Sequence, residues 1–135
     1  MRSRGVGAVL ALVLAAPFAA GCQPPPESVR VEIVIRYSHF TPSEISVPHG
    51  MPVRFVLISQ DPIEHEWLIG DAAFHERHRT GTEPQHGERP NEVTIPPLGT
   101  VETTLIFDAP GEMVAFICHV PGHEAYGMVG TLRVT

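Results

Sequence analysis

The stretch VRVEIVIRY, residues 29–37, decides the fold class because apolar and polar side chains alternate along it. Every second residue is valine, isoleucine or tyrosine, and arginine, glutamate and valine lie between them. Successive side chains of a β-strand point to opposite faces, so this period of two predicts a strand with one buried face. The folded part of the chain is therefore expected to begin at residue 29.

Seven further short segments of strand-like composition follow, and proline or glycine separates them. Proline is poorly tolerated inside sheets, so each one marks the end of a strand. About eight short strands in about a hundred residues predict an antiparallel sandwich of two sheets. The segments are residues 44–47, 53–59, 65–69, 91–95, 101–107, 113–118 and 128–134.

One long polar connection, residues 71–90 (DAAFHERHRTGTEPQHGERP), interrupts this rhythm. Asp71 can cap a short helix that runs through Arg79, and the remainder is expected to be an exposed loop. Three histidines of this loop are candidates for a secondary metal site, although a solvated loop without a ligand remains the alternative. They are His75, His78 and His86.

The first residues have the composition of an export signal, with two arginines before position 5, an apolar run over residues 6–20, and Ala-Ala-Gly-Cys at residues 19–22. The junction resembles the lipobox of bacterial lipoproteins, in which the cysteine is acylated. We therefore predict a signal over residues 1–21, a lipid anchor on Cys22 with a proline-rich tether over residues 22–28, and one domain over residues 29–135. The protein is then exported and lipid-anchored in the periplasm or at the outer cell surface. Ordinary cleavage, which leaves Cys22 as a free thiol, is the alternative.

Charge and cysteine content narrow the classes of partner. The 135 residues carry 9 basic and 15 acidic side chains, a net charge of −6, and so lack the basic surface that nucleic-acid binding requires.

The chain has two cysteines. If Cys22 is acylated, Cys118 is an unpaired thiol in an oxidising compartment, which metal ligation would explain; a Cys22–Cys118 disulfide is the alternative.

The most informative motif is CHVPGHEAYGM, residues 118–128, which has the spacing C-x4-H-x4-M. His65 lies upstream, where another predicted strand begins. A thiolate, two imidazoles and a thioether form a soft ligand set that suits copper, and two histidines with one cysteine and a weak axial methionine bind copper in electron-transfer sites. Zinc rarely recruits methionine, and covalent haem requires C-x-x-C-H, which is absent. The candidate ligands are His65, Cys118, His123 and Met128.

At these residues the sequence resembles the cupredoxins, the small blue copper proteins. The similarity extends to FTPSEISVPHG at residues 40–50, FDAPG at residues 107–111 and GMVGTLRV at residues 127–134, and covers residues 31–135. The resemblance implies a Greek-key β-sandwich that holds one copper ion, cycling between Cu(II) and Cu(I). It also implies that His65, Cys118 and His123 are the equatorial ligands and that Met128 is the axial one.

A cupredoxin of this kind is a carrier and not an enzyme. We expect a monomer that transfers single electrons between redox proteins outside the cytoplasm, with partners docking near His123. The rival interpretation is a copper-sequestering, copper-carrier or copper-resistance protein that does not cycle the ion, and the histidines of residues 71–90 favour it. The fold cannot decide between these two functions, and a purely structural module leaves the ligand set unexplained.

Two residues depart from the family pattern. Glu66 follows the first histidine where the family often has asparagine, and we expect its carboxylate to face outward because its burial without a partner is costly. His119 follows the cysteine where a small residue is usual, and it should point away from the copper because neighbouring strand residues face opposite sides. Met51 and Met113 are expected to be core residues and not ligands.

Overall fold

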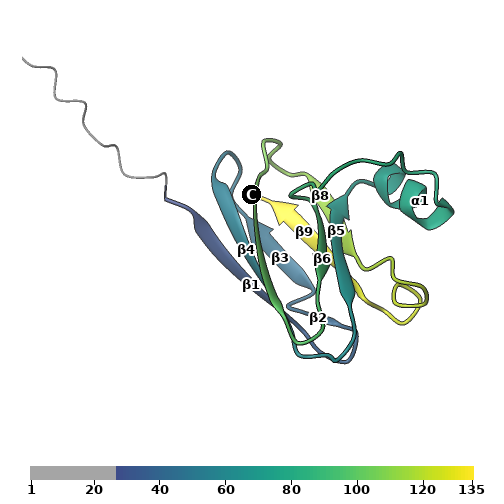
Figure 1. Cartoon of the computed structure of the whole chain (residues 1–135). Helices are drawn as coiled ribbons and strands as arrows, with labels where there is room; N and C mark the ends of the chain where they lie inside the picture. Colours follow the sequence, from purple (N-terminus) through teal and green to yellow (C-terminus); the bar gives the residue numbers. More distant parts are fainter. Residues whose placement is uncertain (1–26) are drawn as a thin grey trace, which may run out of the picture.

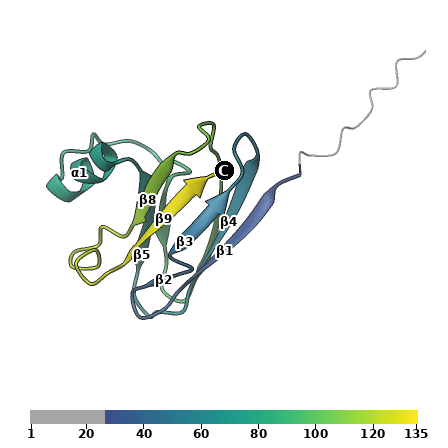
Figure 2. The same cartoon turned by 180° about the vertical axis from the view of Figure 1, so that it is seen from behind.

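The computed structural model describes residues 27–135, which form two β-sheets and one helix (Figures 1 and 2). The predicted export signal, Cys22 and most of the predicted tether lie outside the described residues. Within residues 27–135, no helix is long and apolar enough to cross a membrane.

Two sheets face each other, as the sequence predicts. The four-stranded sheet has the order β2-β1-β4-β7, and its strands are β1 (Val29–Ile35), β2 (Phe40–Thr41), β4 (Pro52–Ser59) and β7 (Thr100–Ile106). The five-stranded sheet has the order β3-β9-β8-β5-β6, and its strands are β3 (Glu44–Val47), β5 (His65–Gly70), β6 (Glu92–Ile95), β8 (Met113–Ile117) and β9 (Val129–Val134). The strand that the sequence pattern missed is β2, whose two residues are too few to show a period.

The prediction of an entirely antiparallel sandwich was wrong. Strand β1 pairs with β4 in parallel, from Val29 opposite Val53 to Ile35 opposite Ser59, and β3 pairs with β9 in parallel. The chain leaves the first sheet after β2, forms β3 in the second sheet, and then returns for β4. Strands that meet after such a crossing can run in the same direction, whereas tight hairpins join only antiparallel neighbours. The result is a mixed sandwich.

Aromatic side chains fill the space between the sheets. Trp67 is fully buried, with its ring centroid 4.8 Å from that of Phe55 in the opposite sheet and 6.1 Å from that of Phe116. The face of β5 that begins with His65 therefore belongs to the core. Met51 and Met113 were wrongly expected in the core: they are 38% and 54% exposed, because one lies in the turn before β4 and the other opens β8 on its outer face.

The predicted short helix is present as α1, Ala72–Thr80. The Asp71 carboxylate caps it by accepting a hydrogen bond from the backbone N–H of Phe74 (2.7 Å), and Gly81 ends it with a positive φ of 66°. Phe74 holds the helix against β5, where only a glycine at position 70 leaves room for the ring. The helix therefore lies beside β5 and β8 (Figure 1).

Candidate metal centre

Three predicted ligands converge at one end of the sandwich. His65 opens β5, Cys118 directly follows β8, and His123 lies in the loop between β8 and β9. The Nδ1 atom of His123 is 3.3 Å from Nδ1 of His65 and 3.3 Å from Sγ of Cys118. Ligand atoms bound to one ion at about 2 Å must lie within about 4 Å of one another, so these three atoms can share a metal.

The ligand loop is closed by its own backbone. The N–H of Met128 donates to the carbonyl oxygen of His123 (3.0 Å), and the N–H of Cys118 donates to the carbonyl oxygen of Met128 (3.2 Å). Gly127 makes the turn before Met128 with a φ of 98°, which disfavours any side chain there. The Met128 side chain is fully buried in the same core cluster as Cys118. The loop thus brings the fourth predicted ligand to the same end of the molecule.

The Cys118 thiol is fully buried. Burial raises its pKa, and the hydrogen bond that Sγ accepts from the backbone N–H of Glu66 (3.3 Å) offsets this only in part. The metal-free site therefore holds a protonated thiol, and a metal ion must displace that proton when it binds. The Glu66 carboxylate lies on the other side of β5, in an open groove beside α1, so its expected outward orientation is confirmed.

A buried carboxylate that the sequence analysis missed orients His65. The Oδ2 atom of Asp61 lies 3.0 Å from Nε2 of His65, and the same carboxylate accepts backbone N–H bonds from Tyr37 (2.7 Å) and Ser38 (2.8 Å). Burial alone would raise the pKa of Asp61, but these hydrogen bonds hold it below the usual value. An ionised Asp61 keeps the proton of His65 on Nε2 and leaves the lone pair of Nδ1 for a metal.

The only signal for Asp61 in the sequence is its position four residues before His65, which is too common a spacing to single out. Burial lowers the pKa of His65, and the contact with Asp61 opposes this shift only in part. A neutral His65 ring directs its Nδ1 lone pair at Nδ1 of His123, 3.3 Å away, so either the N–H of a neutral His123 ring or a metal ion can lie between the two nitrogens. The arrangement therefore suits a bound metal.

His119 points away from the three ligands, as expected from its place next to Cys118. Its Nε2 atom lies 2.9 Å from Nδ1 of His75, and its ring stacks on that of His78 at a centroid distance of 5.7 Å. Burial, reinforced by the neighbouring His75, lowers the pKa of His119 to about 4. The ring is therefore neutral at pH 7 and belongs to the packing between α1 and β8.

The histidines of the long polar connection do not form one group. His75 is buried and uses both ring nitrogens, one with His119 and the other with the carbonyl oxygen of Ala115 (3.1 Å). His86 instead lies close to Glu83 and Glu92, in the segment that precedes β6. The predicted secondary site of His75, His78 and His86 is therefore wrong in its membership, because the helix turns His75 inward.

The family model for copper-binding proteins of the plastocyanin/azurin type matches residues 28–135, which is most of the chain. The chain belongs to the plastocyanin/azurin family of copper-binding proteins. Solved cupredoxin structures agree in fold. Auracyanin B superimposes with a TM-score of 0.66 at 22% identity over 84% of this chain and 92% of that one. Auracyanin A of Chloroflexus aurantiacus does so with a TM-score of 0.63 at 22% identity, over 81% and 100%.

Curated relatives share more of the sequence. The copper-resistant cuproprotein CopI of Pseudomonas aeruginosa is 31% identical over 77% of this chain and 75% of its own length. The protein of the same name from Rubrivivax gelatinosus is 34% identical over 70% of this chain, which spans only 59% of that relative. The chain is thus a copper-binding cupredoxin with a His-Cys-His-Met site. Its family consists of small carriers, in agreement with the prediction that it is not an enzyme.

Proposed function

We propose that this cupredoxin binds one copper ion through His65, Cys118, His123 and Met128 and exchanges single electrons with redox proteins outside the cytoplasm. The observation that carries the proposal is the convergence of Nδ1 of His65, Sγ of Cys118 and Nδ1 of His123 in a buried, pre-folded site. Such a site keeps nearly the same geometry in both oxidation states, so little reorganisation accompanies the transfer of an electron.

The surface around His123 supports docking of a redox partner. Two tyrosines flank this histidine, Tyr37 with 72% and Tyr126 with 75% of its surface exposed, and Pro121 and Gly122 complete the patch. The residues that line the patch are uncharged and mostly apolar, and the Arg36 guanidinium lies 4.8 Å from the centroid of the Tyr37 ring beside them. A surface of this kind suits the small, short-lived interfaces of electron-transfer complexes. An electron would then pass to the partner through the half-buried His123 ring.

A copper titration tests the redox proposal. We would add Cu(II) to the mature chain with Cys22 replaced by serine, record visible and EPR spectra, and then reduce and reoxidise the sample. The expected result is an intense thiolate band that saturates with one equivalent of copper at this site and that bleaches and returns through several cycles. Absence of the thiolate band, or a band that does not return after reduction, contradicts electron transfer at this site.

A role in copper resistance is the second candidate, and the curated relatives favour it because three proteins named copper-resistant cuproprotein match this chain. Deletion of the gene in its own organism should then lower the copper concentration that stops growth. Complementation with a Cys118→Ser variant shows whether copper tolerance depends on the thiolate copper site. If it does, this variant should fail to restore tolerance. Full copper tolerance in the deletion strain contradicts this role.

We also propose that the protein is exported and held at the membrane by acylation of Cys22, which lies outside the described residues. The proposal rests on the apolar run and the Ala-Ala-Gly-Cys junction in the sequence. Mass spectrometry of the protein from membranes should find an N-terminal diacylglyceryl cysteine, and Cys22→Ser should move the protein to the soluble fraction. An unmodified Cys22 in a soluble exported protein contradicts the anchor.

A further inference from the structure

We propose that the segment between α1 and β6, together with the first residue of β6, carries a second, solvent-open metal site for a divalent ion of the Cu(II) or Zn(II) class. The site is formed by Glu83, His86 and Glu92, with His78 beside them. One ligand atom from each of Glu83, His86 and Glu92 lies within 4.8 Å of the others. This site is separate from the copper centre of the proposed function and does not depend on it.

The orientation of His86 points to a cation. Its Nδ1 atom lies 2.7 Å from the carbonyl oxygen of Gly87, which only accepts hydrogen bonds, so Nδ1 carries the proton of the neutral ring. The Nε2 lone pair then faces Oε2 of Glu92 at 2.9 Å and Oε1 of Glu83 at 3.8 Å. A lone pair and a carboxylate repel each other at such a distance unless a positive charge, a second ring proton or a metal ion, lies between them.

His78 repeats this arrangement from the helix. Its Nδ1 atom lies 2.9 Å from the carbonyl oxygen of Phe74, so the neutral ring is again protonated at Nδ1. Its Nε2 atom lies 3.5 Å from the same Oε2 atom of Glu92. Two imidazole lone pairs therefore face one carboxylate oxygen, although His78 does not belong to the set of ligand atoms that lie within 4.8 Å of one another and so stands beside the proposed site.

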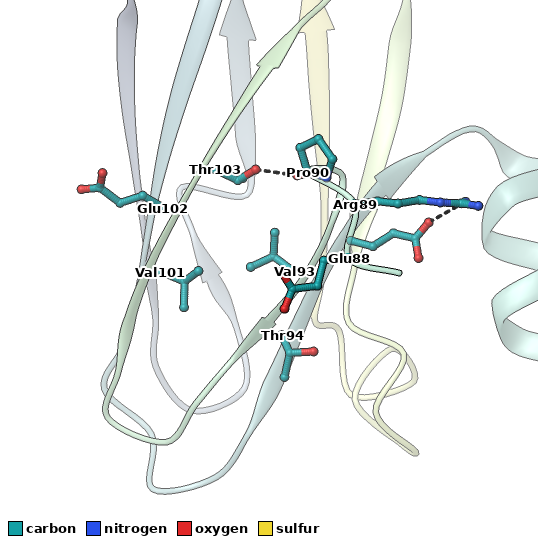
Figure 3. Close-up of a pocket in the computed structure, with 9 residues that line it drawn as sticks. Glu88, Arg89, Pro90, Val93, Thr94, Val101, Glu102 and Thr103 are labelled. Carbon is teal, nitrogen blue, oxygen red and sulfur yellow. Dashed lines mark hydrogen bonds and ion pairs between the residues drawn. The ribbon is translucent and has the colours of Figure 1, made fainter. Parts of the chain in front are cut away.

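Two arginines form ion pairs with the two carboxylates. Arg89 contacts Oε1 of Glu92 (3.2 Å) and Oε1 of Glu83 (3.3 Å), and Arg77 contacts Oε2 of Glu83 (2.6 Å). Figure 3 shows Arg89 extending toward α1, away from the pocket between β6 and β7 in which Thr103 donates to the carbonyl oxygen of Pro90 (2.7 Å). Within residues 27–135, no arginine contacts Oε2 of Glu92, which faces the two histidines.

The ligand set decides the class of ion. An imidazole with two carboxylates suits Zn(II) and Cu(II), whereas calcium and magnesium prefer oxygen alone and Cu(I) prefers sulfur. Hydrogen bonds to ligating carboxylates, such as those from the arginines, are usual around metal sites. His78, His86 and Glu92 also line one open groove, so an ion can reach them from solvent.

The test is a titration of the full mature chain with Zn(II), followed by calorimetry, and with Cu(II), followed by EPR. Each titration is repeated in a Cys118→Ser background, which removes the thiolate of the copper centre and leaves the second site intact. The site variants are His86→Ala and Glu92→Gln. The matched control is His49→Ala, since His49 is an exposed histidine that belongs to neither cluster.

We expect one equivalent of ion that persists in the Cys118→Ser background, gives a Cu(II) signal without a thiolate band, and weakens at least about tenfold in His86→Ala and Glu92→Gln. His49→Ala should bind like the parent protein. Equal stoichiometry and affinity in the parent, His86→Ala and Glu92→Gln overturn the proposal and leave proton-bridged ion pairs as the explanation of the cluster. Loss of the thiolate band alone bears on the proposed copper centre and not on this site.

Discussion

The Nε2 atom of His65 lies 3.0 Å from Oδ2 of Asp61, and both side chains are buried. The same carboxylate accepts the backbone N–H groups of Tyr37 and Ser38, so it joins the turn after β1 to the first residue of β5. Copper bound at His65 would therefore have a full negative charge behind one of its imidazole ligands. Such outer contacts fix the ring tautomer and increase the basicity of the ligand.

Replacing Asp61 by asparagine should raise the reduction potential of the bound copper, because the lost negative charge had favoured Cu(II) over Cu(I). A change of about 1 kcal/mol corresponds to about 40 mV for a one-electron couple. The amide also places an N–H₂ group against one of three donors, so the domain should lose about 1–3 kcal/mol of stability. Voltammetry and urea unfolding measure the two effects.

The control for this change is Glu64→Gln, which removes an exposed carboxylate one residue before His65. It should leave the stability unchanged and move the potential much less, because solvent screens an exposed charge. Equal potentials for Asp61→Asn and the parent protein contradict the role given to Asp61.

Cys118→Ser should abolish the intense visible absorption while the domain stays folded. Absorption of this kind requires a copper–thiolate bond, and the smaller hydroxyl still fits the buried position between the sheets. Circular dichroism checks the fold and visible spectroscopy checks the site. An intensely coloured Cys118→Ser protein contradicts the assignment of Cys118 as the thiolate ligand.

Met128→Leu should retain copper and raise its reduction potential by tens of millivolts, since loss of a weak axial donor destabilises Cu(II) more than Cu(I). The loop should survive because the contacts of Met128 with His123 and Cys118 use backbone atoms. Leucine has a similar volume, so the loss of stability should stay below about 1.5 kcal/mol. Loss of all copper from this variant would show that the thioether is required for binding.

Gly130→Ala should destabilise both the fold and the copper site. A Cβ atom at position 130 of β9 would lie 2.1 Å from the Phe116 ring and 2.7 Å from the carbonyl oxygen of Ser43, so the two strands that flank the ligand loop would have to separate. Overpacking of this kind costs about 1–3 kcal/mol. Gly87→Ala is the control, because its Cβ would meet nothing within 4 Å. Equal melting temperatures for the two variants contradict the packing argument.

The ligands were predictable because their signal is local. The spacing of Cys118, His123 and Met128 fits one loop, and the alternation in residues 29–37 marks a strand. The parallel pairs β1–β4 and β3–β9 were not predictable, since they depend on which sheet receives each strand after a crossing. The hydrogen bonds of Asp61 with the turn after β1 were not predictable either, because 23 and 24 residues separate Asp61 from Ser38 and Tyr37.

The histidines of residues 71–90 show a second limit of prediction from sequence. His75 and His78 are three residues apart, and this spacing cannot tell which of them the helix buries. The capping contact of Asp71 and the packing of Phe74 set the rotation of α1. That rotation turns His75 toward β8 and leaves His78 at the groove with Glu92.

The stability of the metal-free protein should fall as the pH decreases from about 6.5 to about 4. His119 has a folded-state pKa of about 4 because burial and the nearby His75 oppose its charged form, whereas the unfolded chain titrates near 6.5. As the pH falls, the unfolded state therefore binds this proton before the folded state does. The neutral ring contributes its full stability above pH 6.5, and this contribution is lost as the pH falls toward 4. The total loss in the free energy of unfolding is about 3 kcal/mol. Urea unfolding at several pH values measures this slope. His119→Gln should flatten the profile, His49→Ala should not, and a parent profile that is flat between pH 7 and 4.5 contradicts the buried neutral histidine.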